Sequence, residues 1–287
     1  MKKIVKSQKP LYTFFTLVTI FSGLSYSLTF NGNESNIPGG LLLVQFSPAL
    51  AAIITKFLHD RSLRNLGWGW GKSKYQLISY VLPFILTTIG FGLIWLFGFG
   101  GFYNADFILE AQQGLADEFG LDITSPYLIM LVLIIFNSTI GLFISFGSLG
   151  EEIGWRGFLV PELYKHFSYT KTSFISGVIW VTYHIPIIVL LIVPRLDANL
   201  LPILIFTFLG GIGISFILTW LRLKSKSLWT AVIFHAALNI HLQGFFMNLT
   251  TETSELTKYI SGEQGLMMAI VMTTTGYLFW RKRALLK

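Results

Sequence analysis

The sequence predicts an all-α fold, a polytopic bundle of about eight transmembrane helices with the N- and C-termini in the cytoplasm. Two observations predict it. Of the 287 residues, 53% are hydrophobic and only 12% are charged, whereas a soluble domain has about 25% charged residues. The apolar residues also gather in stretches of about 20, the length that crosses a bilayer as a helix. A soluble protein of this size would need more charged residues to cover its surface, so that class is excluded.

The apolar stretches follow one another with polar segments between them. The expected spans are residues 11–30, 40–58, 76–100, 126–147, 173–193, 200–221, 228–248 and 264–280. Lysines precede the first span, as in a signal peptide, but its apolar run is long and no small-residue cleavage site follows before Asn36, so we expect it to remain a span. Residues 102–125 are expected to form a short amphipathic segment at the outer surface.

The charged residues fall on opposite sides of this predicted bundle. With a cytoplasmic N-terminus, all basic residues except Arg195 and Lys258 lie in inner segments. The acidic residues show the reverse, because those in inner segments are only Asp60, Glu151, Glu152 and Glu162. Basic residues gather on the cytoplasmic side of membrane proteins, so the distribution predicts a multi-pass cell-membrane protein in this orientation. The net charge of +7 then reflects topology, and we expect the lipid bilayer as a partner and no nucleic acid.

Glu151, Glu152 and Arg156 follow an apolar run, where charged side chains are costly unless they have a partner or a function. On a helix Glu152 and Arg156 are four residues apart and can pair, while Glu151 points about 100° away and is expected to stay free of that contact. The alternative is a surface helix at the membrane edge, with the two acids at its positive N-terminal end.

Three further polar side chains lie within apolar spans. His184 lies in a lipid-like stretch two residues before Pro186. His235 and Asn239 are four residues apart, so they share one helix face and can point into one cavity. The alternative for each histidine is a hydrogen bond between helices. We do not expect a catalytic role for the remaining histidines, which are His59, His166 and His241.

These polar residues together favour a hydrolase that activates water. A carboxylate and imidazoles can act as general base, and an amide can stabilise an oxyanion. The chain has no cysteine, no serine in a recognisable nucleophile turn and no H-E-x-x-H motif. A divalent metal such as zinc would have to be held by Glu151, His184 and His235 from separate helices, a set of ligands that zinc accepts. The sequence leaves open whether such a metal or no cofactor is used.

The same residues resemble the CAAX-protease and bacteriocin-processing family of intramembrane proteases, also called the Abi family, which includes the type II CAAX prenyl endopeptidases. The motif E-E-x-x-x-R is present as Glu151, Glu152 and Arg156, and an aromatic residue before a histidine as Trp180 and His184. The motif H-x-x-x-N is present as His235 and Asn239. The family usually has Phe where this chain has Trp180, so we expect the ring to keep its packing role. The resemblance covers about residues 125–245.

The resemblance implies an intramembrane endopeptidase with a cavity open to the cytoplasm and the membrane. Glu151 and His184 would activate the attacking water, and His235 and Asn239 would stabilise the oxyanion. Glu152 and Arg156, with Trp180, would have supporting roles. The partner would be a peptide or protein substrate at the membrane, and both metal-dependent and glutamate-type mechanisms fit the family. The helix carrying Glu151 must then continue or re-enter below the membrane surface, because His184 and His235 lie about 10 to 15 Å deep.

The predicted spans and the resemblance together divide the chain into three parts. Residues 1–120 would hold about three transmembrane helices and the outer interfacial loop, and residues 121–248 the catalytic core. Residues 249–287 would hold an outer loop, the last transmembrane helix and a basic cytoplasmic tail. Two other functions remain open, namely a non-catalytic immunity or regulatory membrane protein of the same fold and a small-solute transporter. Inverted repeats, which many transporters have, are not evident in the sequence.

Overall fold

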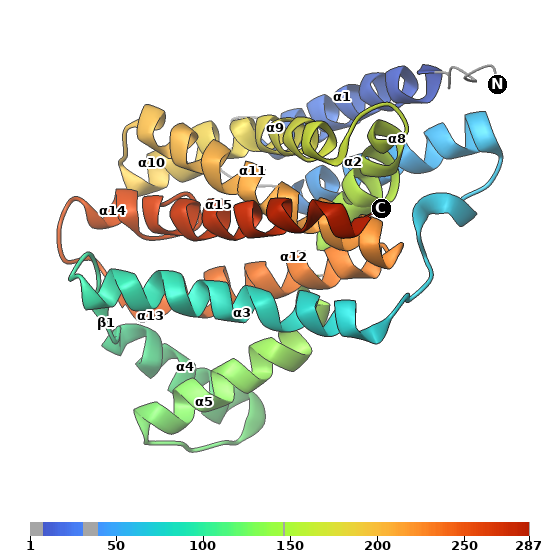
Figure 1. Cartoon of the computed structure of the whole chain (residues 1–287). Coiled ribbons are helices and arrows are strands. Elements are labelled where there is room, and N and C mark those ends of the chain that lie inside the picture. Colours follow the sequence, from blue (N-terminus) through green and yellow to red (C-terminus); the bar gives the residue numbers. More distant parts are fainter. Residues whose placement is uncertain (1–7, 31–39, 146, 287) are drawn as a thin grey trace.

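The computed structural model describes residues 8–30, 40–145 and 147–286, and they form an all-α bundle apart from two strands of two residues each. The long helices run side by side, and α4 and α5 form a separate layer against them (Figure 1). The α-helices and strands are α1 Lys9–Thr29, α2 Gly40–Asp60, α3 Ser73–Leu96, β1 Gly101–Phe102, α4 Ala105–Phe119, α5 Pro126–Phe136, α6 Leu142–Ile144, α7 Gly147–Glu152, α8 Val160–Tyr164, α9 Tyr169–Ile187, α10 Val193–Leu196, α11 Leu200–Ser225, α12 Trp229–His241, α13 Met247–Leu249, β2 Thr250–Thr251, α14 Thr257–Ile260 and α15 Leu266–Arg281.

Short segments of other helical types connect several of these helices. The segments η2, η3, η4 and η5 are π-helical and continue the α-helices before them, while η1 and η6 are 3₁₀ turns. Their bounds are η1 Arg64–Leu66, η2 Asn137–Gly141, η3 Ile153–Leu159, η4 Ile188–Ile192, η5 Leu242–Phe246 and η6 Lys282–Leu286. Single π-helical turns are rare and occur often at functional sites. The segment η3 lies directly after the two glutamates of the predicted site.

A helix stands at each of the eight predicted spans, and the protein is a multi-pass membrane bundle. Within the described residues, six helices are long and apolar enough to cross a bilayer. The other two predicted spans are shorter, because the fourth is helical from Pro126 and turns at Ser145, and the last is the 16-residue α15. The number of crossings therefore stays a prediction. The lysines of residues 1–7 and Glu34, whose charges support the predicted orientation of the bundle, lie outside the described residues.

Loops that the charges place on one side of the membrane contact each other. Strands β1 and β2, from two predicted outer loops, pair antiparallel with Gly101 opposite Thr251. At the other end, the Leu228 backbone N–H donates to the Gly67 carbonyl at 2.7 Å, which joins the inner start of the predicted span 228–248 to a predicted inner loop. The start of α1 and the end of α15 also lie at one end of the bundle (Figure 1). The orientation of that end relative to the cytoplasm stays a prediction.

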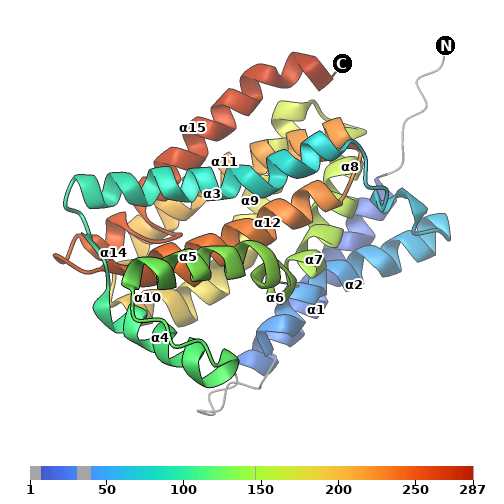
Figure 2. The same cartoon turned by 90° about the horizontal axis from the view of Figure 1, so that it is seen from below.

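The helix that carries the two glutamates lies inside the bundle. Every residue from Gly150 to Val160 is buried. Glycines allow this segment to approach α2 closely, since a Cβ on Gly154 would lie 2.7 Å from the Pro48 carbonyl oxygen, and one on Gly150 would lie 2.7 Å from the Gln45 carbonyl oxygen. The alternative of a surface helix is therefore wrong. Figure 2 shows α7 next to α2, with α12 on its other side, in agreement with the contacts between these elements.

Candidate functional site

Glu152 joins α7 to α12 through one carboxylate oxygen. Its Oε1 accepts a hydrogen bond from Arg156 Nη1 at 2.8 Å and another from His235 Nδ1 at 2.9 Å. The predicted pairing of Glu152 with Arg156 is confirmed, and neither side chain is exposed at all. A buried carboxylate needs compensating partners. The guanidinium and the imidazole supply them, so this pair has the features of a structural ion pair that also holds a histidine.

Glu151 points to a different helix, α9. Its Oε2 accepts a hydrogen bond from the indole Nε1–H of Trp180 at 2.9 Å, and the same oxygen lies 3.6 Å from His184 Nε2. As expected, Glu151 does not share the contact with Arg156, and its donor comes from a distant helix that sequence spacing does not reveal. The side chain of Glu151 is 4% exposed, and that of His184 is 25% exposed. The carboxylate is thus buried behind a histidine that reaches the surface of the protein.

The hydrogen bond of the second ring nitrogen of His184 determines the tautomer of its neutral ring. Nδ1 lies 2.8 Å from the backbone carbonyl oxygen of Trp180. A carbonyl only accepts, so Nδ1 carries the proton. In the neutral ring the lone pair is then on Nε2, the nitrogen that faces Glu151. With this neutral ring, the site presents a carboxylate oxygen and an imidazole lone pair to the same small space.

His235 and Asn239 lie on one face of α12, as predicted. Because His235 Nδ1 bonds to Glu152, its Nε2 is the nitrogen left for another partner. The ring of Trp180 stands between the two histidines, with its centroid 5.1 Å from that of His184 and 5.8 Å from that of His235. Asn239 is half-buried, and within the described part of the chain its side-chain amide makes no hydrogen bond. The structure thus joins every predicted site residue except Asn239 into one contact network.

The residues do not form a metal centre as they stand. The proposed ligand set was Glu151, His184 and His235, and the described residues include no group of three His, Asp or Glu side chains arranged to hold a metal ion. His235 would ligate through Nε2, because its Nδ1 is bonded to Glu152, and a carboxylate partner of this kind is usual for metal-binding histidines. Glu151, His184 and His235 are therefore the residues that would hold a zinc ion.

Two tyrosines, Tyr26 on α1 and Tyr183 on α9, connect the N-terminal helices to the site, and the sequence did not predict these contacts. The Tyr26 hydroxyl, on α1, donates to the backbone carbonyl of Tyr183 at 2.7 Å, and the Tyr183 hydroxyl donates to the carbonyl of Val44 on α2. The signal was present, because Ser22, Tyr26 and Thr29 recur at helical spacing within an apolar span. Helices α1 and α2 thus support the segment that carries His184.

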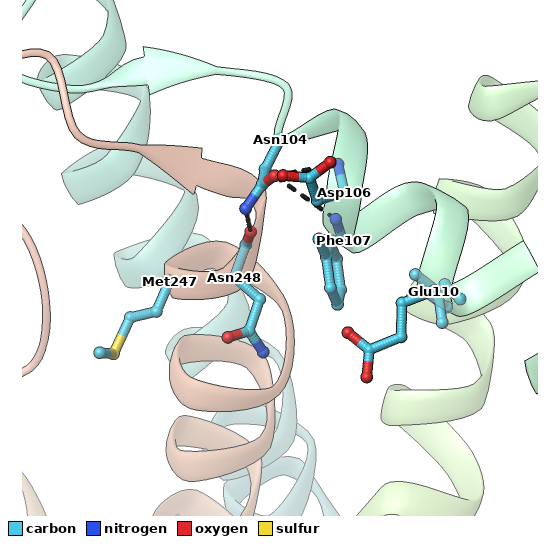
Figure 3. Close-up of a pocket in the computed structure, with 8 residues that line it drawn as sticks. Asn104, Asp106, Phe107, Glu110, Met247 and Asn248 are labelled. Carbon is cyan, nitrogen blue, oxygen red and sulfur yellow. Dashed lines mark hydrogen bonds between the residues drawn. The ribbon is translucent and has the colours of Figure 1, made fainter.

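A cavity of about 660 Å³ lies between α4 and α13. Figure 3 shows Asp106, Glu110 and Asn248 around it, while the Asn104 side chain caps α4 by accepting from the Asp106 and Phe107 backbone N–H groups. None of the predicted site residues lines this cavity. Its carboxylates, those of Asp106 and Glu110, belong to exposed residues, so the cavity has the character of an ordinary surface cleft.

Residues 125–241 match the family described as type II CAAX prenyl endopeptidase Rce1-like. Over 101 residues the chain is also 32% identical to CAAX prenyl protease 2 of the archaeon Methanococcus maripaludis. This second match covers 32% of the chain and 35% of the relative, so it spans about a third of the length of that protein. All of the residues in the network around Glu151 and Glu152 that come from α7, η3, α9 and α12 lie within the stretch that matches the family.

Proposed function

We propose that the chain is an intramembrane endopeptidase that hydrolyses a peptide bond with water activated by Glu151 and His184, in keeping with the match of residues 125–241 to the type II CAAX prenyl endopeptidase Rce1-like family. The observation that supports it most is the 3.6 Å between Glu151 Oε2 and His184 Nε2. When neither atom carries a proton, both are acceptors and cannot hydrogen-bond to each other. A water molecule can donate a hydrogen bond to either of them.

The reaction then follows from the roles of the two groups. Glu151 takes a proton from the water, and the resulting hydroxide attacks the carbonyl carbon of the substrate peptide bond. The proton passes to the nitrogen of the leaving amine as the bond breaks. His184 orients the water through Nε2, and its own orientation is fixed by the bond from Nδ1 to the Trp180 carbonyl. General-base catalysis of this kind contributes about 10²- to 10⁴-fold in rate.

The oxyanion would be stabilised from α12. With protons on both ring nitrogens, His235 would donate from Nδ1 to Glu152 and from Nε2 toward the substrate oxygen. Asn239 lies one turn further along the same face and has an uncommitted amide that can donate as well. Glu152 and Arg156 are positioning residues in this scheme, since they hold His235 and do not contact the water.

The substrate class that fits is a peptide presented at the membrane. The side chain of His184 is 25% exposed, so the site is reached from the edge of the bundle. A prenylated C-terminal CAAX peptide is the substrate that the family description indicates, and other small membrane-associated peptides fit the same chemistry.

A peptide library tests this proposal directly. Purified wild-type protein in lipid nanodiscs is incubated with peptides that include farnesylated CAAX sequences, with and without a chelator, and cleavage is read by mass spectrometry. We expect cleavage by the wild type and none by Glu151→Ala. Glu162→Ala is the matched control, because Glu162 is a buried acid on the neighbouring α8 that pairs with Lys165. Equal cleavage by Glu151→Ala, or no cleavage by the wild type, refutes the proposal.

We also propose that the N-terminus faces the cytoplasm. The chain has no cysteine, so single cysteines introduced at Lys72 and Asp106, which are both exposed and lie in loops predicted to be on opposite sides, report topology without background. We expect an impermeant maleimide added to intact cells to label Asp106→Cys and not Lys72→Cys. The reverse labelling would contradict the orientation.

A further inference from the structure

We propose that Trp180 is a positioning residue whose indole N–H holds the Glu151 carboxylate in the orientation that the reaction needs. The inference rests on the proposed function and extends it to a group that the motif resemblance does not supply. The family usually has Phe at this position, and a phenyl ring has no donor. In this chain the indole Nε1–H donates to Glu151 Oε2 at 2.9 Å in a buried setting.

The carboxylate of a glutamate is otherwise free to rotate. The last torsion of its side chain has a broad energy profile, so packing alone fixes the plane of the carboxylate poorly. Within the described residues, the hydrogen-bond donor to this carboxylate is the Trp180 indole, and His184 Nε2 lies 3.6 Å from the same oxygen. A donor aimed at Oε2 therefore determines which lone pair of that oxygen remains available to a water molecule beside His184.

Trp180 acts on both members of the pair at once. Its backbone carbonyl accepts from His184 Nδ1 at 2.8 Å, and its indole donates to Glu151. The ring itself is fixed from two other sides, with the Arg156 guanidinium carbon 5.4 Å from the ring centroid and the His235 ring edge-on at 89°. The ring is thus held by contacts that a phenyl ring would partly keep, so the distinctive contribution of tryptophan here is the N–H group.

The test removes the N–H and keeps the ring. Trp180 is replaced by 3-benzothienylalanine, which has sulfur in place of the indole N–H, and in parallel by Phe. We expect kcat to fall about 10- to 100-fold in both variants, the loss typical of a hydrogen bond to a charged group, with KM changed by less than about threefold because the substrate does not contact the N–H. A merely structural role would change the melting temperature and would leave the kcat of the benzothienyl variant at the wild-type value.

Trp155 provides the matched control. It is buried on η3, and its indole N–H has no hydrogen-bond partner among the described residues. Benzothienylalanine at Trp155 is expected to leave kcat within about twofold of the wild type. An equal fall in kcat at both positions, or no fall at Trp180, overturns the positioning role while the proposed peptidase function stands.

A spectroscopic readout separates the two proposals. Ultraviolet resonance Raman bands of the indole report hydrogen bonding at Nε1, and subtracting the Trp180→Phe spectrum isolates Trp180. We expect Glu151→Ala to shift this band toward that of a free indole, whether or not any peptide is cleaved. A wild type that cleaves nothing refutes the proposed function, whereas a band unaffected by Glu151→Ala refutes the contact on which the positioning role depends.

Discussion

Glu151 and Glu152 are neighbours in sequence and are both buried, yet they have opposite surroundings. Glu152 Oε1 is held by a guanidinium and an imidazole, both at hydrogen-bond distance, and its side chain is fully enclosed. Glu151 has one neutral donor, Trp180, and lies 3.6 Å from a histidine that is partly exposed. The comparison shows how two adjacent residues of one helix place one carboxylate in a fully enclosed ion pair and the other beside a partly exposed histidine.

The difference arises from the helices that each side chain meets. Successive residues of a helix point about 100° apart, so Glu152 faces α12 while Glu151 faces α9. The burial of the whole segment from Gly150 to Val160 gives both acids a partner from another helix. A charge without a partner at this depth would be costly, and the network is therefore expected to form as a unit.

The largest expected effect is on catalysis by Glu151. Glu151→Gln keeps the size of the side chain and an acceptor for the Trp180 N–H but cannot take a proton from water. We expect kcat to fall about 10²- to 10⁴-fold with expression and melting temperature near those of the wild type, measured on whichever peptide the library identifies. A stability loss as large as the loss of rate would mean that Glu151 is structural, like its neighbour.

Glu152 is expected to show the opposite pattern. Glu152→Ala leaves Arg156 buried without its partner, and breaking a buried ion pair in this way costs about 3 to 5 kcal/mol of stability. We expect a lower melting temperature in detergent and reduced expression. The double variant Glu152→Leu with Arg156→Met removes both charges and is expected to recover much of the stability without recovering activity, since His235 loses its carboxylate. Failure to recover would show that the pair does not act as a unit.

Replacing Asn239 with Ala is expected to lower kcat by an intermediate amount. Its amide makes no other hydrogen bond within the described residues, so Asn239→Ala should cost little stability. If the amide stabilises the oxyanion, kcat should fall about 10²- to 10³-fold while KM stays nearly constant. Gln243→Ala, on η5 beyond α12, is the control, because the Gln243 amide bonds to Glu263 far along the chain. An Asn239→Ala variant with normal kcat would leave His235 as the remaining oxyanion donor.

The partner of Glu152 could be predicted from the sequence, whereas the partner of Glu151 could not. The pairing of Glu152 with Arg156 follows from a spacing of four residues, which is local and readable. The partner of Glu151 comes from a helix 29 residues away, and no local spacing predicts that contact. The apolar stretches predicted where each helix lies, because length and hydrophobicity determine spans. They did not predict the turn at Ser145 that lets the next helix, α7, pack inside the bundle, since this depends on glycines that fit against α2.

The smallest expected effect concerns the contribution of α1, which lies outside the matched residues 125–241. Tyr26→Phe removes the hydroxyl that donates to the Tyr183 carbonyl, one residue before His184. One such hydrogen bond contributes about 1 kcal/mol, so we expect a small fall in melting temperature and a change in kcat of less than about threefold. Tyr12→Phe is the control on the same helix, since the Tyr12 hydroxyl bonds at the exposed surface to Gln8. A fall in kcat for Tyr26→Phe that exceeds its stability loss, without one for Tyr12→Phe, would mean that α1 also orients His184, because the carbonyl it contacts belongs to the turn that carries that ring.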